Sequence, residues 1–533
     1  MTKLLRFATT VIVLFTAIQS NAQAPVLGTS SSFALFSANG AVSNTGLSYL
    51  TGNVGTNNGP NNNFGNVDGV MHNANGTTAI AASDLTIAYN QLNASIPNFF
   101  PAPLLGNGET LIEGTYSINQ SASLNNILTL DGQGNEDAVF IFQVQGSFSS
   151  AAGSQVLLIN GALACNVFWK IEGLVDLATN TDMKGTIVAN NAAIILNSGV
   201  QLEGRALSTT GAVTVSGVTV TTPLGCGIAE LTGPVAPPLN SVACYTVFSG
   251  NGEVTNTGIS FVIGDIGTNV GLTSGFQAEN VTGTIHPNPD VSTAQCASDL
   301  NNVYTYLNVL PVDIELLFPA AFGQDLVLTP HTYLMNAATV LTGKVILNAQ
   351  GNPDAVFVIK INGALSTGTY AEVELINGAQ AKNVFWRIDG ATSLNDYADF
   401  KGTVIGNNGA VILNLGVQIE GRVLSTSGGI TTFGINAVMT PGCEALSTPS
   451  NTIEKPMAQF YPNPFNDSIN IALNDFNTDT IELTVYNSLG AVVIKTILTQ
   501  NNTTIQTNLS SGMYYYQLQC KNGSTQTGKL ISR

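Results

Sequence analysis

The residues able to carry catalytic or metal chemistry are few and do not form a constellation. Three histidines occur, His72, His286 and His331, and none has a zinc-ligand spacing such as His-Glu-x-x-His. Two Glu-Gly-Arg triplets, Glu203 to Arg205 and Glu420 to Arg422, are interpreted as structural ion pairs at strand ends. The sequence therefore predicts no catalytic residue, no metal site and no cofactor.

The acidic residues in turns likewise do not indicate a catalytic or metal site. Asp137 and Asp354 each lie in a Gly-Asn-x-Asp turn, where Asp makes local hydrogen bonds. The segment that begins at Asp131 superficially resembles a calcium loop, but its second copy begins with Asn348 and the spacing misses the EF-hand pattern. A net charge of −17 and the absence of a basic run argue against nucleic acid as a partner.

The elements that position these residues occur twice. A block with a constant offset of 217 residues matches Asn166-Val167-Phe168-Trp169 with Asn383-Val384-Phe385-Trp386, and Cys226 with Cys443. Because no gap opens across the block, both copies must share one backbone. An earlier pair of segments, which begin at Phe36 and Phe248, repeats with a different offset.

Each repeat reads as short strands, one helix and more strands. Runs of 4–8 residues rich in Val, Ile, Phe and Thr alternate with Gly, Asn and Ser, which is typical of strands joined by tight turns. The spacing of Ala81, Leu85, Ala88 and Leu92 predicts one helix, capped by Thr77 or Thr78. Cys296, Leu300, Val303 and Leu307 predict its counterpart, capped by Ser292. Incomplete alternation favours a solenoid, and a β-sandwich remains the alternative.

The two ends of the chain have compositions of their own. Lys3, Arg6 and a short apolar run predict a signal peptide, and no later stretch is apolar enough to span a membrane. The tail carries regularly spaced alternating strands, a small β-sandwich pattern. The predicted organisation is a signal peptide at 1–24, repeat domains at 25–227 and 242–443, linkers at 228–241 and 444–459, and a C-terminal domain at 460–533.

Several motifs of the repeat resemble a known family. The Phe-Ser and Asn-Thr-Gly opening, Gly-Asn-x-Asp-Ala-Val-Phe, Asn-Val-Phe-Trp, Lys-Gly-Thr and Gly-Arg-x-Leu-Ser resemble the ice-binding-like family. The resemblance implies a mainly β fold with two right-handed discontinuous β-helices, each with one long packed α-helix. It also implies an ice crystal surface as the partner of a monomeric protein.

The tail is similar to the sorting domain of the type IX secretion route of Bacteroidetes-like bacteria. The residues that carry the similarity are Tyr461 to Phe465, Val485 to Gly490, Leu509 to Tyr514 and the basic end from Lys529 to Arg533. This similarity implies contact with the type IX secretion machinery and a secreted or cell-surface location.

Small hydroxyl residues at turns are the candidate ice contacts. The predicted ice face of the first copy consists of Ser147, Ser149, Ser150, Thr179, Thr181, Ser198, Thr209, Thr210 and Thr214. Matching turns of the second copy contain Asp396, Tyr397 and Asp399, which would roughen and charge the surface, so the first copy is expected to bind more strongly. The hydroxyls could instead only satisfy their turns.

The sequence leaves two alternative functions open and predicts one disulfide. A noncatalytic carbohydrate-binding adhesin with the same fold is the main alternative to ice binding, and a secreted polysaccharide-active enzyme is the third. Cys244 and Cys296 are absent together from the first copy, where Ser32 and Ala81 align with them. Export to an oxidising compartment therefore predicts a disulfide between Cys244 and Cys296.

Overall fold

The computed structural model describes residues 22–227, 230–443, 457–474, 481–520 and 525–533. The chain divides into two compact units, residues 1–444 and 445–533. Most of the predicted signal peptide and of the second linker lies outside the described residues. No helix among the described residues has both the length and the apolar character that a membrane span needs.

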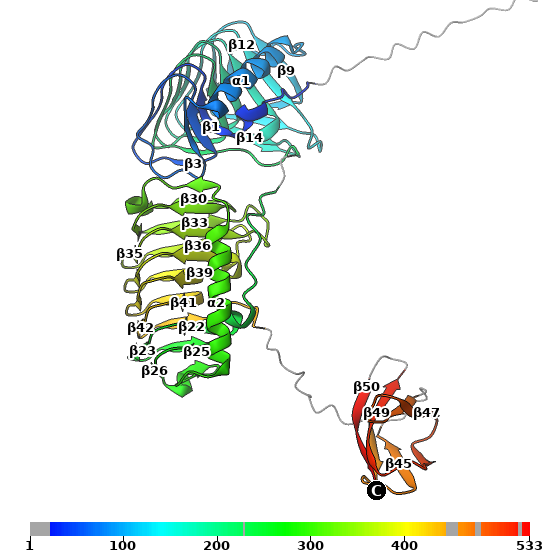
Figure 1. The fold of residues 1–533 in the computed structure, drawn as a ribbon. Helices are drawn as coiled ribbons and strands as arrows, with labels where there is room; N and C mark the ends of the chain where they lie inside the picture. Colours follow the sequence, from blue (N-terminus) through cyan, green and yellow to red (C-terminus); the bar gives the residue numbers. More distant parts are fainter. Residues whose placement is uncertain (1–21, 228–229, 444–456, 475–480, 521–524) are drawn as a thin grey trace, which may run out of the picture. The chain divides into compact units, whose positions relative to one another are not determined.

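The first unit opens with a solenoid whose short parallel strands stack along three faces (Figure 1). We call them the helix face, the charged face and the third face. The helix face contains β9 (Gly114–Ile118), β12 (Phe140–Val144), β15 (Val167–Ile171), β1 (Phe33–Ser37), β4 (Asn53–Thr56) and β6 (Met71–Asn73). The charged face contains β8 (Glu109–Ile112), β11 (Ile127–Asp131), β14 (Gln155–Ile159), β21 (Thr219–Thr221) and β3 (Tyr49–Thr51).

Two long strands belong to both of these faces. They are β17 (Asp182–Ala189) and β19 (Gln201–Ser208), which pair along their whole length. The third face contains β7 (Leu104–Gly106), β10 (Ala122–Asn125), β13 (Phe148–Ser150), β16 (Val175–Leu177), β18 (Ile194–Leu196), β20 (Val213–Ser216), β2 (Val42–Thr45) and β5 (Asn61–Asn62).

The stacking order differs from the order along the chain. Strand β1 pairs with β19, so that Leu35 lies beside Ala206, and β2 pairs with β20. The amino-terminal strands therefore continue the stack beyond the carboxyl-terminal ones. This is the discontinuous β-helix that the family resemblance of the sequence implies.

Helix α1 (Gly76–Ala94) covers the helix face. Its residues Ala81, Leu85, Ala88 and Leu92 are fully buried, as their spacing predicts. The cap is Asn75, whose side chain accepts the backbone N–H of Thr78, whereas Thr77 or Thr78 was expected at that place. Asn serves because its short side chain reaches the unpaired N–H groups of the first turn.

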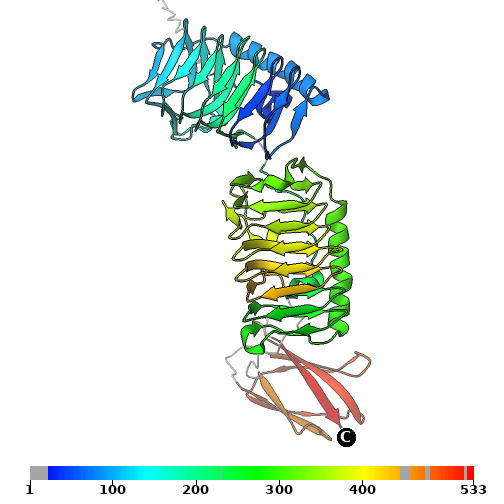
Figure 2. The same cartoon turned by 90° about the vertical axis from the view of Figure 1, so that its left-hand side faces the viewer.

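The second solenoid repeats this architecture, with helix α2 (Val291–Val309) alongside its stacked strands (Figure 2). Its helix face contains β28 (Ile314–Glu315), β31 (Thr332–Met335), β34 (Phe357–Ile361), β37 (Val384–Ile388), β22 (Tyr245–Ser249) and β25 (Asp265–Thr268). Its charged face contains β30 (Leu326–Leu328), β33 (Lys344–Asn348), β36 (Glu372–Ile376), β43 (Asn436–Val438), β24 (Phe261–Ile263) and β27 (Val281–Thr282).

The remaining strands complete the match with the first solenoid. Strands β39 (Asp399–Gly406) and β41 (Gln418–Ser425) again span two faces. The third face contains β29 (Phe322–Gly323), β32 (Thr339–Thr342), β35 (Leu365–Thr367), β38 (Thr392–Leu394), β40 (Val411–Leu413), β42 (Ile430–Phe433), β23 (Val254–Thr257) and β26 (Thr273–Ser274).

The segment before the second solenoid is attached to that solenoid. The carbonyl of Thr232 accepts the backbone N–H of Val356 at 2.9 Å, and the carbonyl of Val235 accepts the hydroxyl of Tyr306 at 3.0 Å. Ala236 packs against the apolar core under α2. The described part of the predicted linker at 228–241 therefore lies along the second solenoid.

The carboxyl-terminal unit consists of two antiparallel sheets around one apolar core, as the alternating strands predict. One sheet contains β44 (Ala458–Tyr461), β45 (Ser468–Leu473) and β48 (Asn502–Gln506). The other contains β47 (Val492–Leu498), β46 (Ile481–Tyr486), β49 (Gly512–Cys520) and β50 (Thr525–Ser532).

Candidate functional site

Two of the three solenoid faces are poorly suited to bind a flat solid. The helix face is covered by α1 or α2. The charged face carries ion pairs in both solenoids: Lys184 with Asp182 at 3.0 Å, and Lys401 with Asp399 at 2.7 Å. Charged groups hold water in arrangements of their own, so the third face is the remaining candidate.

Two rows of side chains point outward from the third face of the first solenoid. Each row, taken over six consecutive coils, has one residue from each coil, because the strands pair in register. Row one precedes the strands and contains Ala41, Ala212, Ala193, Leu174, Ser147 and Ser121. Row two lies within them and contains Ser43, Thr214, Ile195, Asp176, Ser149 and Ser123.

The same two rows exist in the second solenoid. Row one contains Glu253, Gly429, Ala410, Ala391, Ala364 and Ala338. Row two contains Thr255, Thr431, Ile412, Ser393, Ser366 and Val340. Five consecutive coils of row one thus present nothing larger than a methyl group. In the first solenoid Leu174, 42% exposed, interrupts the same row, and Asp176 adds a carboxylate beside it.

Glycines at the preceding corner allow the coils to approach closely. Gly211 has a φ of 149°, and a β-carbon there would lie 2.4 Å from the backbone of Ala192 in the next coil. Gly428 has a φ of 143°, and a β-carbon there would lie 2.2 Å from the carbonyl oxygen of Gly409. A side chain at either position would force neighbouring coils apart and disturb the row that follows.

The structure distributes the predicted ice contacts over one face and its two borders. Ser147, Ser149 and Thr214 lie on the third face. Thr179 and Ser198 lie in turns toward the charged face, and Thr209 and Thr210 lie in the turn from the helix face. The hydroxyls of Thr209 and Thr210 donate to Asn190 and Asn191 of the neighbouring coil.

Thr181 is not a surface residue, contrary to the prediction. Its side chain is fully buried, and its hydroxyl lies 2.7 Å from that of Ser150 and donates to the carbonyl of Ala178. Ser150 is half-buried and also accepts the backbone N–H of Ala178. These two hydroxyls satisfy the turn, because the chain bends there from the third face to the charged face.

The bulky residues of the second copy lie beside the third face rather than on it. Tyr397 stacks on Tyr370 with ring centroids 5.1 Å apart, in turns that border the charged face. Asp399 lies on the charged face and pairs with Lys401. The expected difference between the two copies therefore lies in the turns beside the third face. On the third face itself the two copies differ in another way, at the positions of Leu174 and Asp176.

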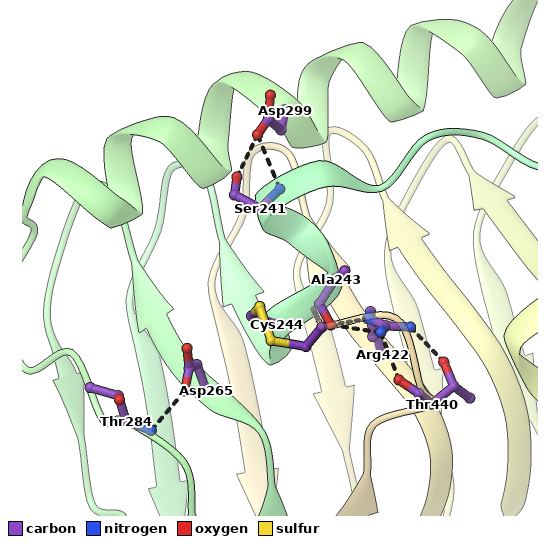
Figure 3. Close-up of a disulfide and its surroundings, with 9 residues drawn as sticks. Ser241, Ala243, Cys244, Asp265, Thr284, Asp299, Arg422 and Thr440 are labelled. Atoms are coloured by element: carbon purple, nitrogen blue, oxygen red, sulfur yellow. Dashed lines mark hydrogen bonds between the residues drawn. A yellow bond between two sulfur atoms is a disulfide. The ribbon is translucent and has the colours of Figure 1, made fainter. Parts of the chain in front are cut away.

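The predicted Glu-Gly-Arg ion pairs do not form. Gly204 lies within β19, between its charged-face and helix-face halves, so Glu203 pairs with Lys184 at 3.4 Å while Arg205 is buried and donates to the carbonyl of Ser31. In the second solenoid Arg422 donates to the carbonyl of Ala243 (Figure 3). Burial lowers the pKa of Arg422 to about 10.

The predicted disulfide between Cys244 and Cys296 is wrong. Cys244 is bonded to Cys443, 199 residues later, close to the buried Arg422 (Figure 3). Cys296 is a free thiol buried in the apolar core beneath α2, and that burial raises its pKa. In the first solenoid Cys226, the repeat counterpart of Cys443, is bonded instead to Cys165. The residue equivalent to Cys165 in the second solenoid is Lys382, so Cys443 has no equivalent of Cys165 to bond with and pairs with Cys244 instead.

Comparison with known proteins identifies the family. Residues 36–221 and 248–438 both match the Ice-binding-like family, and together they are more than half of the chain. The chain therefore belongs to the ice-binding-like family. An ice-binding protein of Nostoc sp. (strain HG1) is 37% identical over 211 residues, which cover 38% of this chain and 77% of that protein. One from Colwellia sp is 31% identical over 248 residues, covering 44% and 88%.

A solved structure is similar across both solenoids. The crystal structure of an ice binding protein from an Antarctic bacterium of the Flavobacteriaceae is 73% identical, with a TM-score of 0.78. The match covers 79% of this chain and 100% of that chain. Residues 459–533 match the secretion system C-terminal sorting domain, so the protein is secreted or carried on the cell surface.

Proposed function

We propose that the protein adsorbs to ice through the third face of both solenoids. The observation that carries this proposal is row one of the second solenoid, where Gly429, Ala410, Ala391, Ala364 and Ala338 follow one another in register over five coils. Family membership supports ice as the ligand. The protein acts by binding to a surface rather than by catalysis.

The geometry of stacked coils explains why such rows suit ice. Neighbouring strands lie about 4.7–4.9 Å apart, so equivalent side chains form straight and regular rows. Row one leaves room for ordered water beside the backbone, and the Ser and Thr hydroxyls of row two can anchor water. Each contact is weak, so a rigid array must act together to give useful affinity.

The second solenoid is the stronger binder in this proposal. Leu174 and Asp176 stand in adjacent outward positions of one coil in the first solenoid, and Ala391 and Ser393 replace them in the second. The leucine side chain projects beyond its small neighbours and keeps ordered water away from the backbone of the row. The carboxylate orders water around its own charge. This order is the reverse of the one that the turn residues predict.

A face-specific pair of variants tests the proposal. Ala193→Tyr with Ala410→Tyr places one ring on the third face of each solenoid and should abolish ice shaping and thermal hysteresis. The matched control, Gln201→Tyr with Gln418→Tyr, alters exposed and equivalent positions of the charged face and should leave both measurements intact. Full activity of the first pair, with unchanged melting temperatures, would refute the third face as the ice site.

The sorting domain has a separate role in this proposal. It forms its own compact unit around its own apolar core. A chain without residues 460–533 should fail to reach the cell surface while keeping its thermal hysteresis after purification. Loss of hysteresis in a folded truncated protein would contradict this division of roles.

A further inference from the structure

The loop at residues 63–70 joins the two solenoids. It connects β5 to β6 at the end of the first stack, and Phe64 and Val67 fill the end of that solenoid's core. Val70, at the other end of the loop, packs against the core of the second solenoid. A single loop therefore belongs to both apolar cores.

Asn66 makes a two-way hydrogen bond to the second solenoid. Its side-chain amide donates to the carbonyl of Phe318 at 2.9 Å, and its side-chain oxygen accepts the backbone N–H of Phe318 at 2.9 Å. This pattern imitates the pairing of one strand with another. Such a bond is directional, so it fixes an orientation as well as a contact.

Asp68 makes the second polar contact, and it is only 3% exposed. The hydroxyl of Thr329 donates to one carboxyl oxygen at 2.8 Å, and the hydroxyl of Tyr333 donates to the other at 2.5 Å. Burial raises the pKa of Asp68, while the nearby His331 and the two hydroxyls oppose that shift. A buried carboxyl group is costly unless its partners stay in place, so this contact tolerates little movement.

The repeat shows that these contacts are particular to the junction. In the second solenoid Asn280 and Thr282 occupy the positions of Asn66 and Asp68, and Asn280 bonds within its own loop, to Gln277. In the first solenoid Ile112 stands where Thr329 stands in the second, so the hydroxyl partner is missing. The outer end of the second solenoid therefore lacks the carboxylate acceptor of Asp68, and the outer end of the first solenoid lacks the hydroxyl donor of Thr329.

We propose that the loop at residues 63–70 is a docking element that holds the two solenoids in a fixed relation, so that their third faces bind one ice crystal as a single bivalent unit. The bivalent part of this inference rests on the proposed function. Two linked weak sites gain affinity without any new contact when their separation is fixed and both can engage the surface. The absence of the Asp68 contacts at the outer ends keeps the docking one-to-one.

Distance measurements test the fixed relation without ice. Spin labels at Gln201→Cys and Gln418→Cys, in a full chain with Cys520→Ser, report one distance between the solenoids. The distribution should be narrow in this parent and broad after Asn66→Ala with Asp68→Ala. The equivalent pair Asn280→Ala with Thr282→Ala is the matched control and should stay narrow. A narrow distribution in the Asn66 and Asp68 variant would overturn the docking element.

Adsorption to ice tests the bivalent part. The parent should bind ice about twofold to threefold more tightly than a chain whose weaker third face is blocked by Ala193→Tyr, and loosening the junction should remove that advantage. Thr329→Val, which removes one hydroxyl from the other side of the contact, gives a milder loss if the double variant folds poorly. Bivalent binding would be overturned if a chain with a broad distance distribution still bound ice more tightly than its Ala193→Tyr variant by the same factor as the parent does. Equal ice binding by the parent and a chain with both faces blocked would instead contradict the proposed function and leave the distance result standing.

Discussion

The two solenoids share one backbone and differ on the face that we assign to ice. In the first, Leu174 stands in the middle of a row of small residues, with Asp176 in the next outward position. In the second, the equivalent positions hold the smaller, uncharged Ala391 and Ser393. The two copies thus share the spacing of their coils and differ in their outward side chains. The backbone makes the surface regular, and the side chains decide how well that surface binds ice.

The largest effect should come from roughening the flatter face. Ala410→Tyr places a ring in the middle of row one of the second solenoid and should lower thermal hysteresis by on the order of tenfold, because a raised side chain breaks several neighbouring contacts at once. Ala193→Tyr, the equivalent change in the first solenoid, should have a much smaller effect. The comparison would fail if the two variants lost activity equally while keeping the parental melting temperature.

Exchange of the differing residues should convert one face toward the other. In a chain whose second face is blocked by Ala410→Tyr, Leu174→Ala with Asp176→Ser should raise hysteresis several-fold, since it restores a flat, uncharged row. In a chain blocked by Ala193→Tyr, Ala391→Leu with Ser393→Asp should lower it. No response to either exchange would show that these positions do not set the difference.

Removal of each disulfide should reveal unequal cross-links. Breaking either bridge by Cys→Ser pairs should cost about 2–4 kcal/mol of unfolding free energy. The bridge from Cys244 to Cys443 closes 199 residues and that from Cys165 to Cys226 closes 61, so loss of the first should lower the melting temperature more. Calorimetry of the two double variants measures this, and the opposite order would show that strain or residual structure outweighs loop length.

The smallest effect is a difference in acid stability between the helices. Asp290, and not the predicted Ser292, caps α2. Hydrogen bonds from the Ser292 hydroxyl, the Thr293 backbone N–H and His286 hold the pKa of the Asp290 carboxyl well below its usual range. Such a carboxylate contributes stability above its unfolded pKa of about 3.9 and loses it as the pH falls toward the folded value. Asn75 caps the first helix without a titrating group.

Asp290→Asn tests this difference directly. The parent should melt above the variant near pH 6, by a margin typical of a cap, and the gap should narrow progressively as the pH falls below about 3.9. Asn75→Asp is the converse control and should make the first helix sensitive to acid. A gap that does not vary with pH would assign the stabilisation to geometry rather than to charge.

Repetition made the fold predictable. A constant offset of 217 residues between Cys226 and Cys443 requires a shared backbone, and the spacing of Ala81, Leu85, Ala88 and Leu92 locates the helix. The partners of Cys244 and Arg205 were not predictable, because both lie where amino-terminal strands stack on carboxyl-terminal ones. Local sequence contains no information about that closure.

The third face could have been found from a signal that the hydroxyl residues obscured. A glycine or alanine followed by another small residue precedes most strands of this face, as at Ala192-Ala193 and Gly409-Ala410. Ser and Thr also occur in the turns, where hydroxyls such as that of Thr181 satisfy the backbone and are no guide to the ice face. In a solenoid, side chains that are consistently small identify a flat face better than side chains that can donate hydrogen bonds.

The discontinuous order of the coils also sets when each solenoid can fold. Strand β1 cannot pair until β19 has been made, because Leu35 pairs with Ala206. Likewise β22 cannot pair until β41 has been made, because Val247 pairs with Val423. Contacts between residues so distant along the chain form slowly. An emerging chain therefore cannot complete its first core until nearly the whole domain has been synthesised. This delay favours export, since a chain that closes late remains threadable while it crosses a membrane.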